Sequence, residues 1–380
     1  MNEEGQSNGN DLVVDAFGGS VLDYQRLIDE FGIKPISDLI PHIPKFTQHP
    51  YMSNFRDVMF GHIDLEPVVK AAVDKEPFGV MTGIKPSSAE YHIGNLITCN
   101  EVVHFQKIGG EVFLCIADLE SYADGRTPLE EAEQNAIENI ADILALGLDL
   151  ENAYIYRQSK EPKVQKFGFL FSSHVTYNMM RAIYGDKPFG MYFSALIQAA
   201  DILLPQLKRN PMPTITPIGA DQAPHARLTR DIARKNIFRQ KYGFKMPGFT
   251  FHRLIGGLEG SDKMAKRTPM SVLTLYEDPE MLRKKVLNTF TGGRTTVAEQ
   301  RELGGRPEIC RVYDLYRFFF LDDDSELEKI CKNCKTGELL CGEDKKRLLT
   351  LASEFIENHK KKRLDFLDKA KEIVIERVPS

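Results

Sequence analysis

The chain has 380 residues, of which 42% are hydrophobic and 27% charged, and its formal net charge is −5. This length exceeds what one compact core usually holds and predicts about two to three domains. The acidic balance argues against a protein coated with basic surface for nucleic acid, so we expect no DNA partner, although it leaves room for local basic patches.

No stretch approaches the roughly 18 uninterrupted apolar residues that a membrane span needs. Residues 1–11 are polar and acidic and lack the apolar segment of a secretory signal. The six cysteines are then typical of cytosolic thiols rather than of a disulfide framework. We therefore expect a cytoplasmic protein that makes no contact with a membrane.

The first 68 residues form an N-terminal extension by our interpretation. Residues 1–16 are rich in Asn, Gly, Glu and Ser without periodicity, which predicts disorder. After them, helical patterns alternate with breaks at Pro35, Pro41 and Pro44. We expect this region to pack on the main domain.

A strand, a loop, a helix and a second strand follow one another between residues 78 and 117. The apolar run 78–82 predicts a short buried strand, a helix begins near Gly94, and 112–117 is a second apolar strand. This order is a βαβ unit, which implies parallel strands joined by a right-handed crossover. A helix over 130–146 and strands over 153–156 and 214–218 extend the pattern.

These elements predict an α/β catalytic domain over 69–290, a doubly wound parallel fold of the Rossmann type whose sheet runs from about residue 76 onward. Beyond it, strand-like alternation disappears, and 291–380 is predicted to be an α-helical C-terminal domain. Its expected helices span 312–321, 325–334 and 345–372.

Four of the six cysteines lie in this helical region, at Cys310, Cys331, Cys334 and Cys341. The CxxC spacing of Cys331 and Cys334 is one that zinc and iron–sulfur sites use. No second CxxC and no nearby histidine completes a ligand set, so we favour buried or incidental cysteines and predict no metal site.

The loop 82–88 carries the first candidate chemistry. In an open parallel sheet, ligands bind in the crevice beyond the carboxyl ends of the strands. A helix N-terminus in that place favours anionic phosphate. His92 can donate a hydrogen bond to a phosphate oxygen, and Gly94 lets a flat purine approach the backbone. Taken alone, the sequence His92-Ile93-Gly94-Asn95 is equally compatible with a structural histidine.

A second loop strengthens the catalytic interpretation. The glycine-rich stretch 256–262 leads into Lys263-Met264-Ala265-Lys266-Arg267. Lysines on a mobile loop can meet the charge that develops on a departing pyrophosphate in the transition state. A solvated basic loop is the alternative. Together with His92 and its βαβ setting, the functional interpretation is favoured.

These two segments resemble the signatures of the class I aminoacyl-tRNA synthetases. Residues 92–95 resemble HIGH, with Asn95 in place of the last histidine, as occurs among tryptophan enzymes. Residues 263–267 resemble KMSKS, with Ala265 and Arg267 replacing the serines. Residues 219–222 resemble the GxDQ turn, which in relatives holds the ribose of ATP.

The resemblance implies ATP and Mg²⁺ as cofactors and three catalytic residues: His92, Lys263 and Lys266. It implies that ATP is bound by Thr82, Gly83, Lys85, Ser87, His92, Gly94, Asn95, Gly219, Asp221, Gln222, Lys263 and Met264.

Local features favour tryptophan over tyrosine as the amino acid. Tyrosyl enzymes place a tyrosine where Met81 stands, and a site that selects a phenol needs polar partners for its hydroxyl. Asp201 lies on a helix that resembles the substrate helix of tryptophanyl enzymes, although tyrosyl enzymes also have an aspartate there. Its carboxylate can accept the indole N–H. The segments 221–233 and 290–305 also resemble the tryptophanyl family.

The similarity is greatest to the archaeal and eukaryotic branch, in which a carboxylate matching Glu120 binds the substrate's ammonium group. That branch often contacts the indole through a tyrosine and a glutamine, where Met81 and Cys115 stand here. Asp201 would then take this role, as in the bacterial branch. The implied substrate-binding residues are Met81, Glu120, Gln198, Asp201 and Gln222.

The resemblance therefore implies a tryptophan–tRNA ligase, which joins L-tryptophan to tRNA(Trp) through a tryptophanyl-adenylate and releases pyrophosphate and AMP. It further implies a homodimer and an anticodon-binding role for 291–380. In the lysine-rich stretch 359–363, phosphate contacts and a solvated helix face are both open. The rival interpretations are a tyrosyl-tRNA synthetase, a generic adenylyl transferase that has lost tRNA charging, and a non-catalytic RNA-binding or signalling protein.

Overall fold

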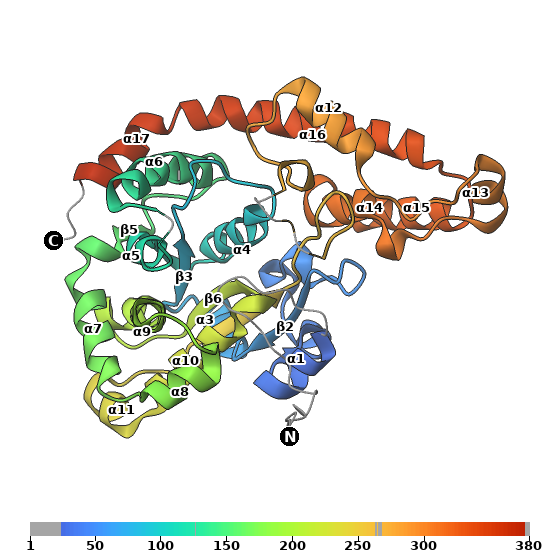
Figure 1. Ribbon diagram of the computed structural model, residues 1–380. Helices are drawn as coiled ribbons and strands as arrows, with labels where there is room; N and C mark the ends of the chain where they lie inside the picture. The colour runs from blue at the N-terminus through green and yellow to red at the C-terminus, as the bar shows by residue number, and fades with distance from the viewer. Residues whose placement is uncertain (1–23, 126, 263, 265–267, 377–380) are drawn as a thin grey trace, which may run out of the picture.

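The computed structural model describes residues 24–125, 127–262, 264 and 268–376 (Figure 1). The disorder expected for 1–16 lies outside these residues. No helix among the described residues is long and apolar enough to cross a bilayer.

A seven-stranded sheet forms the centre of the part of the chain that the structure describes, with strand order β1-β2-β7-β6-β3-β4-β5. Five neighbouring strands, from β7 to β5, run parallel, and β2 and β1 are added antiparallel at one edge. The strands are β1 (Lys34–Pro35), β2 (Met59–Ile63), β3 (Gly79–Ile84), β4 (Glu111–Ile116), β5 (Ala153–Arg157), β6 (Thr214–Gly219) and β7 (Gly248–His252).

The predicted βαβ unit is confirmed. Strand β3 leads through α4 (Asn95–Lys107) to β4, and the two strands pair in parallel with Met81 opposite Phe113 and Gly83 opposite Cys115. The expected helix over 130–146 is α6 (Leu129–Ala145). The chain moves outward from β3 to β5 and then returns to β6 on the other side of β3. Strand β3 therefore borders the point where the strand order reverses, which is where ligands bind in such sheets.

The sheet begins earlier than the expected residue 76, so this prediction was wrong at its N-terminal edge. Strands β1 and β2 come from the N-terminal extension, and β2 pairs with β7, a strand that the sequence did not reveal. Four of the five residues of β2 are buried, so the strand lacks the alternation that marks a half-exposed one. A Cβ atom at Gly61 would clash with the side chain of Ile33, the residue before β1, so Ile33 packs directly on this glycine.

Alternate side chains of the strands enter two separate cores. Val80 and Val112 belong to the core beneath α4 and α6, whereas Met81 and Phe113 belong to the core beneath α9 (Phe189–Lys208). This division follows from the two-residue period of a strand. Helices therefore cover both faces of the sheet, and the doubly wound fold is confirmed (Figure 1). The remaining helices of the first 260 residues are α1 (Tyr24–Phe31), α2 (Ile36–Leu39), α3 (Glu66–Asp74), α5 (Asp118–Ala123), α7 (Pro162–Ser172), α8 (Tyr177–Tyr184), α10 (Ala223–Arg234) and α11 (Asn236–Tyr242).

The C-terminal region is helical, as predicted, and forms an arm that projects from the sheet (Figure 1). The prediction of one helix over 345–372 was wrong, because α16 ends at Leu364 and a separate helix, α17, begins at Leu367. Asp365 and Phe366 separate the two helices, and Phe366 packs partly buried against the core. The helices of this region are α12 (Pro279–Asn288), α13 (Val297–Leu303), α14 (Arg311–Leu315), α15 (Asp324–Lys335), α16 (Cys341–Leu364) and α17 (Leu367–Lys371).

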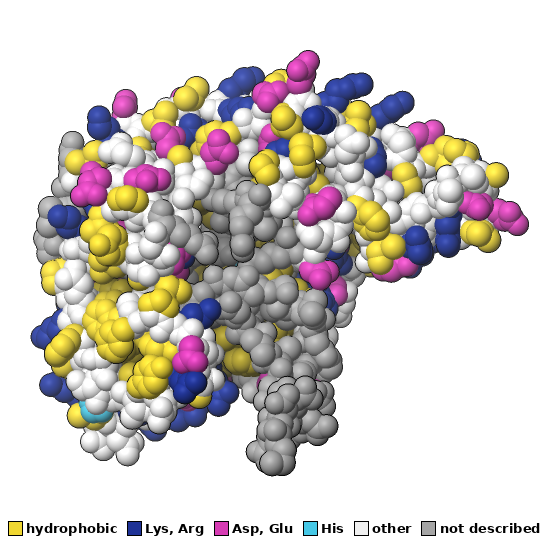
Figure 2. Space-filling model, viewed as in Figure 1, with side chains coloured by type: hydrophobic (Ala, Val, Ile, Leu, Met, Phe, Trp, Pro, Cys, Tyr) yellow, Lys and Arg dark blue, Asp and Glu magenta, His cyan; other side chains and the backbone are white. Residues whose placement is uncertain are grey.

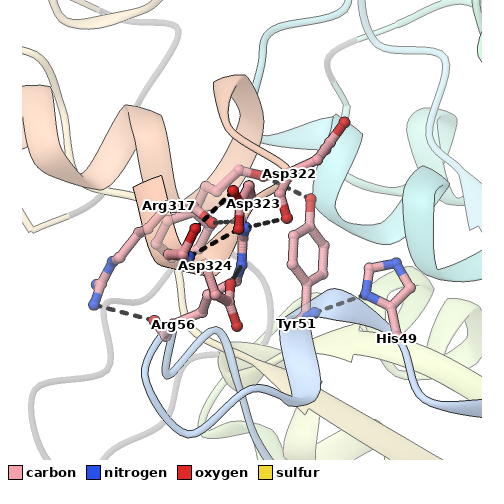
Figure 3. Close-up of polar contacts among 9 residues, drawn as sticks. His49, Tyr51, Arg56, Arg317, Asp322, Asp323 and Asp324 are labelled. Atoms are coloured by element: carbon pink, nitrogen blue, oxygen red, sulfur yellow. Dashed lines mark hydrogen bonds and ion pairs between the residues drawn. The ribbon is translucent and has the colours of Figure 1, made fainter. Parts of the chain in front are cut away.

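Arg56 joins the N-terminal extension to the arm (Figure 3). Its guanidinium is 2% exposed, donates to the carbonyl oxygens of Arg317 and Asp322 at 2.9 and 2.8 Å, and contacts Asp324 Oδ1 at 2.5 Å. Nearby, the Tyr51 hydroxyl donates to the Phe318 carbonyl at 2.7 Å. Two segments more than 250 residues apart in sequence are thus held by buried hydrogen bonds.

Replacing Arg56 with methionine should lower the free energy of unfolding by about 2–4 kcal/mol, because buried carbonyl oxygens would lose their charged donor. Lys34→Met is the matched control. Its ion pair with Glu66 has side chains 58% and 41% exposed, and such exposed pairs contribute about 1 kcal/mol or less. Urea unfolding followed by circular dichroism measures the free energy of unfolding of both variants. Equal losses in the two variants would contradict this account of Arg56.

Candidate active site

Two cavities open at the carboxyl ends of the parallel strands, one on each face of β3. The first, of about 280 Å³, lies on the side of α9, and the second, of about 320 Å³, lies against the start of α4. They share four lining residues: Thr82, Gly83, Lys85 and Thr98. Ligands in the two cavities would therefore meet over the end of β3.

All five predicted substrate-binding residues line the first cavity, together with four further residues predicted to bind ATP. The substrate set is Met81, Glu120, Gln198, Asp201 and Gln222, and the others are Thr82, Gly83, Lys85 and Gly219. The strand ends and α9 thus bring together side chains that lie up to 141 positions apart, from Met81 to Gln222.

Asp201 is buried at the base of this cavity and is 2% exposed. Its carboxylate accepts a hydrogen bond from the Tyr156 hydroxyl at 2.8 Å and another from Gln158 Nε2 at 2.6 Å. Burial raises the pKa of Asp201 to about 7, although both hydrogen bonds oppose that shift. Each carboxylate oxygen has a further lone pair, so Asp201 can also accept from a ligand N–H.

Gln158 connects Asp201 to Glu120 and was not identified from the sequence. Its Oε1 accepts from the backbone N–H of Glu120 at 3.2 Å while its Nε2 donates to Asp201. Glu120 lies in the first turn of α5, and its Oε1 is 3.6 Å from Lys85 Nζ. Burial raises the pKa of Glu120, which Lys85 partly opposes. Gln158 thus links the Asp201 carboxylate to the backbone of Glu120.

Two more cavity residues escaped the sequence predictions, Thr98 and His225. The His225 ring contacts the Tyr184 hydroxyl at 2.9 Å, and burial lowers the pKa of His225 to about 3, so the ring is neutral. Tyr156 and Gln158 could have been found from their place, because they end or follow β5 at the same edge of the sheet.

The segment 92–95 has a well-defined local geometry at the start of α4. The backbone N–H of His92 donates to Asn95 Oδ1 at 3.1 Å, and the N–H of Gly94 donates to His92 Nδ1 at 3.1 Å. Because Nδ1 accepts, the neutral ring carries its proton on Nε2, which is then a donor. A Cβ atom at Gly94 would lie 2.9 Å from the imidazole, so glycine is needed for this ring position.

His92, Gly94 and Asn95 line the second cavity with Ser87 and Lys85. The start of α4 borders the same cavity, and the positive end of its helix dipole favours an anion there. The predicted phosphate-binding residues of the first loop are thus brought together in one cavity.

Asp221 is 7% exposed in a short 3₁₀ turn after β6 and is not among the residues that line either cavity. A Cβ atom at Gly219 would lie 2.7 Å from its carboxylate, so Gly219 permits this close turn.

The second signature segment is only partly described, because Lys263 and Lys266 lie outside the described residues. Met264 is 4% exposed, belongs to the core beneath α4, and its N–H donates to the Ile255 carbonyl at 2.9 Å. Its side chain therefore stabilises the base of the loop. Among the residues that the structure describes, no group of three or more His, Cys, Asp or Glu could hold a metal ion.

Comparison with known proteins gives one family. Residues 73–357 match the family model described as tRNA synthetases class I (W and Y). A tryptophan–tRNA ligase of Hyperthermus butylicus is 38% identical over 362 residues, covering 94% of this chain and 95% of the relative. One from Methanocaldococcus jannaschii is 36% identical over 364 residues, covering 94% and 95%.

Solved structures agree with this result. The tryptophanyl-tRNA synthetase of Aeropyrum pernix K1 has a TM-score of 0.85 at 37% identity and covers 93% of this chain and 95% of its own. The enzyme of Plasmodium falciparum has a TM-score of 0.83 at 27% identity, covering 94% and 99%.

Asp201→Asn should change how stability depends on pH. In the wild-type protein, the raised pKa means that the folded state holds this proton between about pH 4 and about pH 7, where the unfolded chain releases it. Its contribution to stability is therefore complete below about pH 4 and is lost as pH rises toward about 7. Asparagine cannot titrate.

Urea unfolding of the wild-type protein and of Asp201→Asn, at about pH 5 and about pH 8, measures how the free energy of unfolding depends on pH. Wild-type protein should lose more stability than the variant between the two conditions. Parallel pH dependences would show that Asp201 is ionised throughout.

Proposed function

The chain belongs to the class I tRNA synthetases for tryptophan and tyrosine, and we propose that it attaches L-tryptophan to tRNA(Trp) at the expense of ATP. In the first step, a carboxylate oxygen of tryptophan attacks the α-phosphorus of ATP, and the bond to pyrophosphate breaks. In the second, a ribose hydroxyl of the tRNA takes the aminoacyl group and AMP leaves.

One observation carries this proposal: Asp201 and Glu120 lie in one cavity that joins the cavity of His92 over the end of β3. The indole N–H would donate to Asp201, the ammonium group would bind Glu120, and the carboxylate would point toward the second cavity. No protein nucleophile is needed, because positioning and charge neutralisation accelerate such a transfer.

Tryptophan fits this cavity better than tyrosine does. Met81, 2% exposed, offers no hydrogen bond to a phenol and can pack against a flat indole. The tyrosine alternative is not favoured, because the relatives reported above are all tryptophan enzymes.

ATP fits the second cavity, since the positive end of the α4 dipole favours phosphate there and the Nε2–H of His92 is a hydrogen-bond donor. Lys263 and Lys266 would neutralise the departing pyrophosphate. Mg²⁺ would neutralise phosphate charge while held mainly by phosphate oxygens and water, as this ion commonly is.

We propose that residues 291–380 bind the anticodon, after a catalytic domain over 69–290 and an extension over 1–68. On α16, His359, Lys360 and Arg363 contact the catalytic domain, whereas Lys361 and Lys362 are exposed. The latter two are available to tRNA phosphates. The six cysteines are free thiols, which supports a cytoplasmic location.

We also propose a homodimer. Exposed apolar side chains gather over α7, α8 and the start of α9, where Phe169, Tyr177 and Phe189 are 66%, 56% and 75% exposed (Figure 2). Contiguous apolar surface of this kind commonly marks a protein–protein interface.

Exchange of labelled pyrophosphate into ATP tests the proposed function without tRNA. We expect exchange with tryptophan and not with tyrosine. Glu120→Gln should raise the KM for tryptophan about tenfold or more, because a charge-assisted hydrogen bond to the ammonium is weakened. The KM for ATP should change little. Exchange with tyrosine, or with neither amino acid, would contradict the proposal.

The dimer is tested by sedimentation equilibrium. Wild-type protein should have twice the chain mass of 43.1 kDa, and Phe189→Glu should shift it to the monomer because a buried charge opposes association. Leu303→Glu, at a 58% exposed leucine on α13, is the control and should stay dimeric. A monomeric wild-type protein would contradict the proposal.

A further inference from the structure

We infer that three side chains of α16, namely His359, Lys360 and Arg363, position His92 for ATP. We call these three residues the α16 clamp. The inference rests on the proposed function and deepens it, because it gives the C-terminal helix a part in the first, tRNA-independent step.

The segment 273–277 connects the clamp to His92. His92 forms an isolated antiparallel bridge with Thr274. On either side of it, the N–H of Ile93 donates to the Leu273 carbonyl at 2.8 Å, and the N–H of Leu275 donates to the Tyr91 carbonyl at 3.0 Å. The backbone position of His92 is therefore fixed by a segment outside α4, and that segment follows the lysine loop in sequence.

Asp142 of α6 holds this segment through one carboxylate that is fully buried. The Tyr276 hydroxyl donates to its Oδ2 at 2.7 Å. From α16, His359 Nε2 and Arg363 Nε lie 2.9 and 3.1 Å from its Oδ1. The Arg363 guanidinium also lies over the Tyr276 ring, 4.8 Å from its centre. Removing either partner from α16 would take a hydrogen bond from this buried carboxylate.

Glu277 provides a second attachment. Its carboxylate accepts from the N–H and hydroxyl of Thr274, both at 3.2 Å, and pairs with buried Lys285. Lys360 Nζ donates to its backbone carbonyl at 2.5 Å. The clamp thus holds the segment at Tyr276 and Glu277, and the Glu277 carboxylate continues the connection to Thr274, which pairs with His92.

The other end of α16 packs against α12 and α14 of the arm. A single helix therefore spans from the proposed anticodon-binding region to the segment beside His92 (Figure 1). Because such a helix moves as one element, its placement sets the placement of His92. The clamp residues are positioning residues, since none of them lines either active-site cavity.

The test measures kcat/KM for ATP and the dissociation constant for tryptophan separately, in the variants Tyr276→Phe and His359→Asn. Phenylalanine keeps the ring but loses the hydrogen bond to Asp142, and asparagine is too short to reach it. We expect kcat/KM for ATP in pyrophosphate exchange to fall about 10-fold to 100-fold. The dissociation constant for tryptophan should stay within about twofold, because the α9 face of β3 is undisturbed. The chain contains no tryptophan, so the ligand's own fluorescence reports binding.

His359→Gln can return an amide N–H toward Asp142 and should recover part of the lost kcat/KM for ATP. Glu357→Gln changes the charge at an exposed position of the same helix, so it is the control. Its kcat/KM for ATP should equal that of the wild-type protein.

Wild-type kcat/KM for ATP in Tyr276→Phe and His359→Asn would overturn the inference, even if both variants melt at a lower temperature. A parallel loss of tryptophan binding would also overturn it, because it would indicate general destabilisation. Absence of tryptophan-dependent exchange in the wild-type protein would instead contradict the proposed function.

Discussion

The parallel pairing of β3 with β4 on one side and β6 on the other is the constraint on which the site depends. It places the carboxyl ends of three strands at one edge, so the loops that follow them must meet there. The two-residue period then sends Met81, Cys115 and Tyr156 to the α9 face. Residues of the first loop and of α4 line the cavity on the other face. In the proposed function, the amino acid and the nucleotide would bind on opposite faces of β3 and share the residues at its end.

Buried carboxyl groups are costly, and this fold holds several of them near its site. Asp201 and Glu120 have raised pKa values because water is excluded around them. Tyr156, Gln158 and Lys85 partly offset that cost. A group kept partly desolvated in this way interacts strongly with a ligand N–H or ammonium, because the local dielectric constant is low. The same burial that weakens stability at neutral pH therefore favours recognition.

The sequence allowed the β3–α4–β4 unit and both cavities' main residues to be predicted, because apolar periodicity and glycine-rich loops are local signals. Contacts that form only in the folded chain were missed. The place of Gln158 after β5 indicates the edge of the sheet on which it lies, but its role follows from hydrogen bonds to residues 38 and 43 positions away. Strand β2 lacked alternation because its residues are nearly all buried. The end of α16 at Leu364 is marked by no glycine or proline in the sequence.

A crystal structure with bound tryptophan and a non-hydrolysable ATP analogue tests the central claim most directly. The account predicts that the indole nitrogen lies within hydrogen-bond distance of the Asp201 carboxylate and the ammonium group beside Glu120. The phosphates should lie along the start of α4 near His92. An indole turned away from Asp201, or an amino acid bound outside the cavity between β3 and α9, would contradict it.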